Sequence, residues 1–112
     1  MKRYCLTLDL KNDPKLIAEY KRHHERIWPE VRDSLHQAGV LEMEIYLLET
    51  RMFMIMDTRD DYTFEAHAAI DNANTRLQEW QDLMSTFQQL LPGTKPGEKW
   101  RLMEKVFQLS NQ

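Results

Sequence analysis

Hydrophobic and polar residues alternate along three segments of the chain. These segments are residues 3–10, 40–49 and 51–57. Alternation with a period of two is typical of a strand that buries one face. The second and third segments are separated by room for only a tight turn, which predicts an antiparallel hairpin. The positions expected to share a face are Tyr4, Leu6, Leu8 and Leu10 in the first strand, Leu41, Met43, Ile45 and Leu47 in the second, and Met52, Met54 and Met56 in the third.

Two further segments carry hydrophobic residues at helical spacing. The first, residues 14–38, follows a suitable N-cap at Asp13, begins with a proline and stops at Gly39. The second covers residues 60–91, with a break expected in the polar, turn-prone stretch 71–74. Its hydrophobic set is Phe64, Ala68, Leu77, Trp80, Leu83, Met84, Phe87 and Leu91.

Residues 92–99 read as an irregular loop and residues 100–109 as the last strand. The expected order is therefore βαββαβ, an α+β fold of the ferredoxin-like plan. It predicts one domain over residues 1–112, with two helices on one face of a four-stranded antiparallel sheet. The middle strands also carry hydrophobic residues on their other face. Because such a face must be covered, we expect two sheets to pack face to face in a homodimer.

The composition of the chain limits which kinds of partner and which cellular compartment are expected. The formal net charge is −3 and no basic run stands out, which argues against nucleic acid as a partner. No hydrophobic run approaches the roughly 20 residues that cross a bilayer, so we expect no membrane span. The N-terminal segment lacks the apolar core of a signal peptide. A single cysteine, Cys5, excludes an internal disulfide and favours a reducing compartment, the cytoplasm.

The segment YKRHHERIWPEV, residues 20–31, is the most unusual part of the first helix. His24 occupies the helical position that completes the hydrophobic stripe, whereas His23 points about a hundred degrees aside. Tyr20 lies one turn before His24 and Trp28 one turn after it, so the three side chains can share a surface. The proline after Trp28 disfavours helical geometry there, which predicts a kink or joint. A histidine between a phenol and an indole indicates the wall of a small polar-ligand site.

The same residues allow other interpretations. A lone histidine on a hydrophobic face is commonly a packed core residue, and spacing alone leaves that alternative open. A metal site is disfavoured because His23 and His24 do not converge on one ion. His36 and His67 have no ligand pattern near them in the sequence. Cys5 could approach His24, but nothing around it indicates an activated thiol.

Five segments together resemble the L-rhamnose mutarotase family: EYKRHHERIWPEV, AGVLEMEIYL, RMFMIMD, LQEWQDLM and EKVFQL. The resemblance covers nearly the whole chain, in order. It implies a dimeric α/β barrel built from ferredoxin-like subunits, and hence a homodimer. It also implies an isomerase that interconverts the α and β anomers of a monosaccharide, a 6-deoxy-L-sugar, without metal or cofactor.

The resemblance also assigns residues. His24 matches the family's catalytic histidine, Tyr20 a tyrosine of the sugar site, and Trp80 the first of two adjacent tryptophans that contact sugar. Two substrate-binding positions differ, because Gln81 stands at the second tryptophan and Met43 at a further tyrosine. Such changes alter how sugar hydroxyls are recognised. L-Fucose, or another deoxy sugar, is therefore an alternative substrate to L-rhamnose.

Mutarotation opens a cyclic hemiacetal and closes it on the other face, which a general acid and a general base suffice to catalyse. Histidine suits this chemistry because it exchanges protons near neutral pH. We expect His24 to protonate the ring oxygen and Tyr20 to position the sugar, with Trp80 and Trp28 as flat apolar walls. The spacing does not identify the partner base, for which a carboxylate, Tyr46 or a water are alternatives.

The fold alone permits other classes of protein. A ligand-binding module or a cofactor-free monooxygenase of the same barrel class would have a larger apolar pocket for a planar aromatic, which the methionine-rich stretch 52–56 would suit. A purely structural dimer, with His24 packed in the core, is a third possibility. A deoxy sugar that raises the melting temperature where aromatic acids do not would separate these alternatives.

Overall fold

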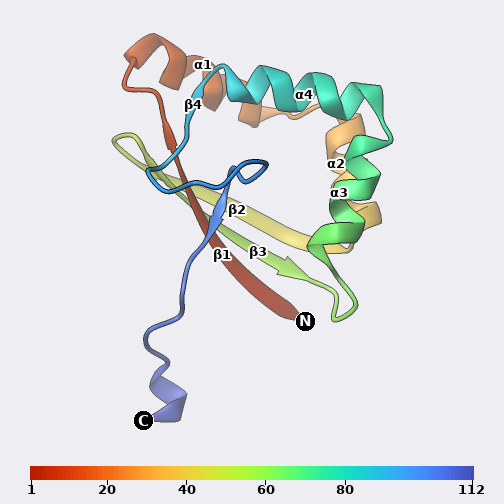
Figure 1. The fold of residues 1–112 in the computed structure, drawn as a ribbon, viewed down its shortest axis with the longest axis vertical. Helices are drawn as coiled ribbons and strands as arrows, with labels where there is room; N and C mark the ends of the chain where they lie inside the picture. The colour runs from red at the N-terminus through yellow and green to blue at the C-terminus, as the bar shows by residue number, and fades with distance from the viewer.

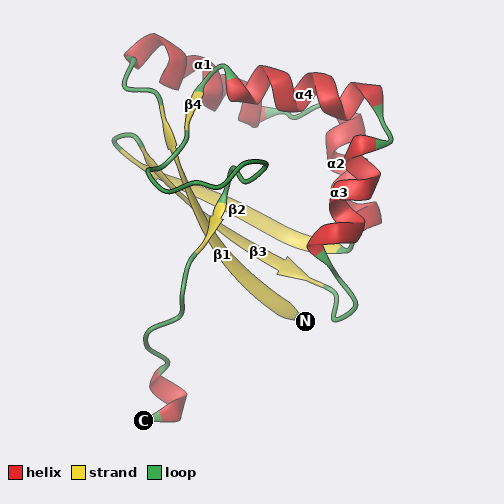
Figure 2. Ribbon diagram, viewed as in Figure 1, coloured by secondary structure: helices red, strands yellow, loops and turns green.

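The computed structural model describes residues 1–112 and contains one antiparallel sheet with helices on one side of it (Figure 1, Figure 2). The strand order is β2-β3-β1-β4, and β5 also pairs with β1. The last strands therefore lie beside the first, as the ferredoxin-like plan requires. The elements are β1 (Lys2–Leu10), α1 (Pro14–Glu25), α2 (Pro29–Ala38), β2 (Val40–Leu48), β3 (Arg51–Thr58), α3 (Phe64–Asn72), α4 (Thr75–Ser85), β4 (Gln88–Gln89), β5 (Arg101–Leu102) and a 3-10 helix, Leu109–Asn111.

The joint predicted near Trp28 is a complete break between α1 and α2. Trp28 has extended backbone angles, φ −61° and ψ 140°, as expected for a residue that precedes a proline. Pro29 then occupies the first turn of α2, where its missing N–H is not needed. The second helical segment is also divided within the predicted stretch 71–74, because α3 ends at Asn72 and α4 begins at Thr75 with Asn74 as its N-cap. In Figure 1, α1 and α4 lie across the top of the sheet while α2 and α3 descend along one side.

The predicted helix boundaries follow from capping. The Asp13 side chain accepts hydrogen bonds from the backbone N–H groups of Lys15 and Leu16, at 2.9 Å and 3.3 Å. Gly39 ends α2 with φ 100°, a left-handed conformation in which a β-carbon is disfavoured. Both ends were predicted from the residue types alone.

The β2–β3 hairpin is confirmed, with one correction. Glu49 has φ 56° in the tight turn. Met43 pairs with Met56 and Ile45 with Met54, so their side chains face the helices. The pairing shifts between Val40 and Glu42, which makes Leu41 the extra residue of a bulge. Leu41 is 53% exposed, so the prediction that it shares the buried face was wrong.

The C-terminal part differs most from the predicted elements. Residues 100–109 do not form one long strand, because only Arg101 and Leu102 pair with β1. The following backbone leaves the sheet and extends away from the body of the molecule (Figure 1). Residues 88–89, expected at the end of a helix, instead form the short strand β4 beside β1. The sheet consequently has five strands rather than four, and within the single chain it is open.

The core lies between the inner face of the sheet and the helices. Leu8 is fully buried at the centre of β1, and Met52 is 1% exposed beside it on β3. Tyr20 of α1 and Trp80 of α4 pack on this layer from the helical side. No helix has both the length and the apolar character needed to cross a bilayer. The helices and the sheet thus enclose the space in which the candidate site lies.

Candidate active site

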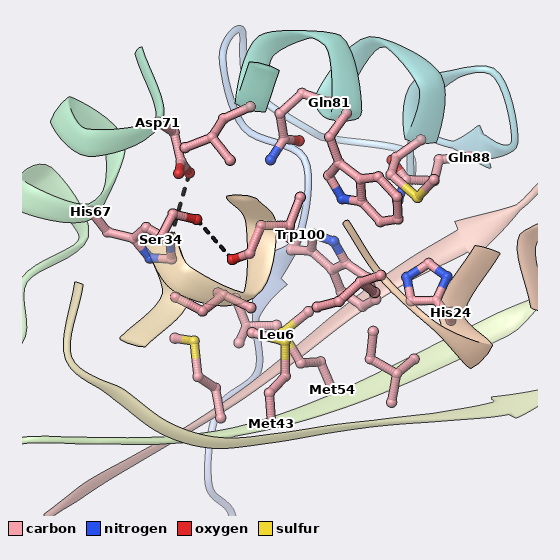
Figure 3. A pocket seen from close by; sticks show the side chains of 18 of the residues that line it. Leu6, His24, Ser34, Met43, Met54, His67, Asp71, Gln81, Gln88 and Trp100 are labelled. Carbon is pink, nitrogen blue, oxygen red and sulfur yellow. Dashed lines mark hydrogen bonds and ion pairs between the residues drawn. The ribbon is translucent and has the colours of Figure 1, made fainter. Parts of the chain in front are cut away.

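A cavity of about 310 Å³ lies between the helices and the inner face of the sheet. Methionines and aliphatic residues of the strands form its floor, and Met43, Met54 and Leu6 point up into it (Figure 3). Fifteen of its 21 lining residues are hydrophobic, so the few polar groups determine what it can bind. The other six lining residues are His24, Ser34, His67, Asp71, Gln81 and Gln88, and the hydroxyl groups of Tyr20 and Tyr62 add two further polar groups.

His24 lies at one end of this cavity, in the last turn of α1. Its Nδ1 is 2.9 Å from the backbone carbonyl oxygen of Tyr20, one turn earlier. Because a carbonyl oxygen can only accept, Nδ1 carries the proton and donates it. The neutral ring therefore has its lone pair on Nε2, which is the nitrogen left free for a ligand.

The surroundings of His24 favour its neutral form. Burial lowers the pKa of the imidazole below 6.5, and the neighbouring His23 lowers it further. The hydrogen bond to the Tyr20 carbonyl opposes this shift without cancelling it. Burial also raises the pKa of the Tyr20 phenol, which keeps it a hydrogen-bond donor. The ring centroids of Tyr20 and His24 are 4.3 Å apart, so a neutral base and a phenol lie side by side.

Trp80, Gln81 and Met43 also line the cavity. Trp80 is 6% exposed and its ring centroid is 5.8 Å from that of His24. The Gln81 side chain lies at the rim, where its amide oxygen accepts a hydrogen bond from Lys99 Nζ at 3.3 Å. Met43 contributes to the floor from β2. Tyr20, His24, Met43, Trp80 and Gln81 are thus brought together around one space.

Trp28 is placed differently from the expectation. It is absent from the cavity wall and packs against Trp80, with ring centroids 5.1 Å apart and planes at 66°. The guanidinium carbon of Arg76 lies 3.7 Å from the centre of the Trp28 ring, a cation–π contact. Trp28 therefore supports Trp80 from behind and does not itself face the cavity.

Gln88 is a cavity residue for which the sequence pattern gave no indication. It lies in the short strand β4 and is 8% exposed. Its Nε2 is 3.5 Å from the Tyr20 hydroxyl oxygen, whereas its Oε1 is buried without any hydrogen-bond partner. A buried acceptor of this kind costs free energy unless it is satisfied. A hydroxyl donor on a bound ligand would satisfy it.

A second polar cluster lies at the other end of the cavity. His67 and Asp71 are one turn apart on α3, with Nε2 of the histidine 3.6 Å from Oδ2 of the aspartate. The Tyr62 hydroxyl is 2.6 Å from Nδ1 of His67. Burial raises the pKa of Tyr62 to about 12. The spacing of four between His67 and Asp71 was visible in the sequence, but nothing there related α3 to the helix that carries His24.

Three chemical alternatives can be judged from the geometry. Tyr46 is 56% exposed, lies on the outer face of β2 and is hydrogen-bonded to Glu44, so it is not a base for the cavity. Cys5 alternates with Leu6 and points to the opposite face of the sheet from His24. A paired Cys5–His24 nucleophile is therefore not formed. No three His, Cys, Asp or Glu side chains lie close enough together to hold a metal ion.

Comparison with known proteins gives concordant results. A family model described as L-rhamnose mutarotase matches residues 3–109. An L-fucose mutarotase from Xanthomonas campestris pv. campestris is 47% identical over 112 residues, which cover 98% of this chain and 90% of that protein. Together these matches span the strands, the helices and the cavity between them.

Two solved structures share the fold. A crystal structure of an L-rhamnose mutarotase from Formosa agariphila superposes with a TM-score of 0.70 and 23% identity, covering 97% of this chain and 99% of that one. A dimeric ferredoxin-like protein from an uncultured marine organism gives a TM-score of 0.53 and 14% identity, with 94% and 89% coverage. At these identities the likeness concerns the fold, which is the ferredoxin-like plan predicted from the strand order.

Proposed function

Since the chain belongs to the L-rhamnose mutarotase family and is thus a sugar mutarotase, we propose that it interconverts the α and β anomers of a 6-deoxy-L-sugar with His24 as the acid/base group. The observation that carries this proposal is the placement of His24. One ring nitrogen is held by a backbone carbonyl, and the other is free at the wall of a cavity of monosaccharide size.

The proposed proton path needs only one titrating residue. Nε2 of neutral His24 takes the proton of the anomeric hydroxyl as the bond between C1 and the ring oxygen breaks. The resulting imidazolium then gives this proton to the ring oxygen, which has left C1 with the electron pair. Both oxygens are bonded to C1 in the closed sugar, so one nitrogen can reach each in turn. After the aldehyde rotates, the reverse steps close the ring on its other face.

Tyr20 supports this path as a hydrogen-bond donor. Burial raises the pKa of its phenol, so the hydroxyl stays protonated at neutral pH. A donor beside His24 stabilises negative charge that develops on the ring oxygen before the proton arrives. Trp80 and Trp100 contribute flat hydrophobic surfaces for the C–H side of the sugar.

We propose L-fucose as the first substrate to test. The 47%-identical relative is named an L-fucose mutarotase. Gln81 and Met43 also depart from the tryptophan and tyrosine that the resemblance implies at their positions. The cytoplasmic location stays a prediction from the single cysteine.

We further propose that the protein works as a homodimer. The segment after β5 carries Val106, Phe107 and Leu109, which are 87%, 64% and 75% exposed. The Lys2–Tyr4 part of β1 pairs with β3 only and has no strand on its other edge. An extended hydrophobic segment and an open strand edge are both features that a second copy would cover. One structural neighbour is described as dimeric.

The direct test is exchange NMR on L-fucose and L-rhamnose at anomeric equilibrium, with and without the protein. The wild-type chain should accelerate interconversion of at least one sugar. His24→Asn should lower the catalysed rate by about 10²–10⁴-fold, while His36→Asn, at an exposed position of α2, should not. A folded protein that accelerates neither sugar would contradict the proposed function, and full activity in His24→Asn would contradict the assignment of His24.

A further inference from the structure

We propose that His67 and Asp71 form the specificity end of the cavity, where they bind the sugar hydroxyl at C4 and so distinguish 6-deoxy-L-sugars by its configuration. This inference rests on the proposed mutarotase function and deepens it. Neither residue has a part in the proton path assigned to His24. Both nevertheless line the same cavity.

The hydrogen bond from Tyr62 fixes which nitrogen of His67 is available. Nε2 of His67 faces the Asp71 carboxylate, which favours the tautomer with its proton on Nε2, so Nδ1 accepts from the Tyr62 O–H across 2.6 Å. A neutral imidazole that accepts at Nδ1 carries its proton on Nε2. Nε2–H is thus a fixed donor. Tyr62 is 3% exposed, so the group that orients the ring is held in the core.

The Nε2–H group of His67 and the carboxylate of Asp71 are close to each other but do not form a hydrogen bond. Their atoms are 3.6 Å apart, longer than a well-formed N–H···O hydrogen bond. A hydroxyl is both a donor and an acceptor, so it can accept from Nε2–H and donate to Oδ2 at once. Burial raises the pKa of Asp71, because its carboxylate lacks solvation. A hydroxyl that donates to the carboxylate would replace the lost water.

The position of the pair indicates which hydroxyl it binds. Figure 3 shows His24 at one end of the cavity and His67 with Asp71 at the other. The proton path requires the anomeric carbon, C1, beside His24. In a six-membered sugar ring the carbon opposite C1 is C4. A sugar seated for catalysis therefore presents its C4 hydroxyl toward His67 and Asp71.

This end of the sugar is where the candidate substrates differ. L-Fucose and L-rhamnose have opposite configurations at C2 and C4, so the C4 hydroxyl is axial in one and equatorial in the other. A fixed donor and acceptor suit only one of these directions. A site built to hydrogen-bond a hydroxyl also rejects a sugar that leaves its buried groups unpaired. The hydrophobic floor of methionines cannot make this distinction.

The test combines variants with a modified substrate. Rates of anomer interconversion are measured for L-fucose, L-rhamnose and the 4-deoxy analogue of the preferred sugar. Asp71→Asn keeps the shape of the side chain, and His67→Gln keeps an amide donor. Asp33→Asn is the matched control, because Asp33 is 70% exposed on α2 and pairs only with Arg32.

Removal of the C4 hydroxyl should lower kcat/KM of the wild-type protein by about 10–100-fold. Asp71→Asn should lower kcat/KM for the preferred sugar by a similar factor. It should have little effect on the 4-deoxy analogue, which has nothing to donate. The ratio of the L-fucose and L-rhamnose rates should move toward one, whereas Asp33→Asn should keep the wild-type ratio.

Each other outcome has a distinct meaning. If the wild-type protein accelerates no sugar, the proposed function fails before the specificity site is tested. If the wild-type protein is active but Asp71→Asn slows the normal and 4-deoxy sugars equally, the pair is structural and the inference is overturned. Equal wild-type rates for the two sugars would overturn it as well. Should His67→Gln fail to fold, as judged by circular dichroism, the near-isosteric Asp71→Asn decides the question alone.

Discussion

His24 shows how a backbone hydrogen bond can prepare a side chain for chemistry. The backbone carbonyl oxygen of Tyr20, one turn before His24 in α1, lies 2.9 Å from Nδ1 of His24. By accepting from Nδ1 it selects the tautomer whose Nε2 is basic. The hydrophobic stripe predicted the direction of this side chain, because residues 20, 24 and 27 must share a face in any helix.

The first prediction concerns pH. The active form of free His24 is neutral, and burial lowers its pKa from 6.5. The rate constant kcat/KM should therefore be level near neutrality and fall as the pH drops through a value below 6.5. The measurement is NMR exchange at pH values from about 4.5 to 8, in steps on the order of half a pH unit. The uncatalysed rate at each pH is subtracted. An inflection above 6.5, or one retained in His24→Asn, would contradict the role assigned here.

The second prediction concerns Gln88, whose amide oxygen is buried and unpaired. Gln88→Leu removes an acceptor that a sugar hydroxyl would use, so sugar affinity should fall about 10-fold. The melting temperature of the free protein should stay level or rise, since an unsatisfied group is lost. Calorimetric titration and thermal unfolding measure the two quantities. Gln89→Leu, at the exposed neighbouring position, is the control; a drop in melting temperature with unchanged affinity would show that Gln88 is only structural.

At this scale the sequence could not reveal every residue of the cavity. Helical period places Tyr20 and His24 relative to each other, and strand alternation places Met43. His67, Asp71 and Gln88 lie on other elements, and their approach depends on the angles between helices. Trp28 was expected on the cavity wall, but the break at Pro29 changes the direction of the chain and places Trp28 behind Trp80.

Among the elements, the helix pairs are the feature that creates the cavity. An unbroken helix over residues 14–38 would lie flat on the sheet. The breaks after α1 and α3 instead let α2 and α3 descend along one side (Figure 1). Proline and polar turn residues predicted where these breaks occur, since they act locally on the backbone. The angles across the breaks depend on tertiary packing and could not be predicted.

The third prediction concerns the junction of α2 and β2 at Gly39. A β-carbon there would lie 3.1 Å from the Arg59 guanidinium, in addition to the strain of φ +100°. Gly39→Ala should lower the free energy of unfolding by about 1–2 kcal/mol, measured by urea denaturation. Gly97→Ala is the control, because φ is +83° and no atom lies within 4 Å. The excess loss at Gly39 should disappear in an Arg59→Ala background; equal losses in both single variants would rule out the Arg59 contact.

The last strand shows the limit of pattern alone at this scale. Residues 100–109 have the composition of a strand, yet only residues 101–102 pair. A strand forms only where the edge of another strand is available for pairing. The sequence pattern does not indicate whether that edge lies in the same chain or in a second chain.

For the whole molecule, the fold of the single chain and its assembly into a dimer have to be considered separately. The order βαββαβ predicted the ferredoxin-like plan correctly, because few connections of these elements are possible. The dimeric α/β barrel that the resemblance implies is built from two subunits, and the sheet of the single chain is open. The homodimer stays a proposal, supported by the exposed segment after β5.

The fourth prediction tests that proposal. Deleting residues 104–112 should convert a dimer into a monomer, since it removes the exposed Val106, Phe107 and Leu109. Light scattering after size-exclusion chromatography measures the mass, and deletion of residues 111–112 alone is the control. A full-length chain that is monomeric would disprove the dimer, and a shortened chain that stays dimeric would move the interface to the outer face of the sheet.

The cluster of indole rings has a practical consequence for following the protein in solution. All three tryptophans of the chain lie at or behind the cavity: Trp80 and Trp100 line it, and Trp28 is 5.1 Å from Trp80. Indole fluorescence responds to local polarity and to a nearby imidazole that gains a proton. The entire tryptophan emission of the protein therefore reports on one small volume. A colourless sugar can be titrated against that emission without any label, and the same signal would record the protonation of His24.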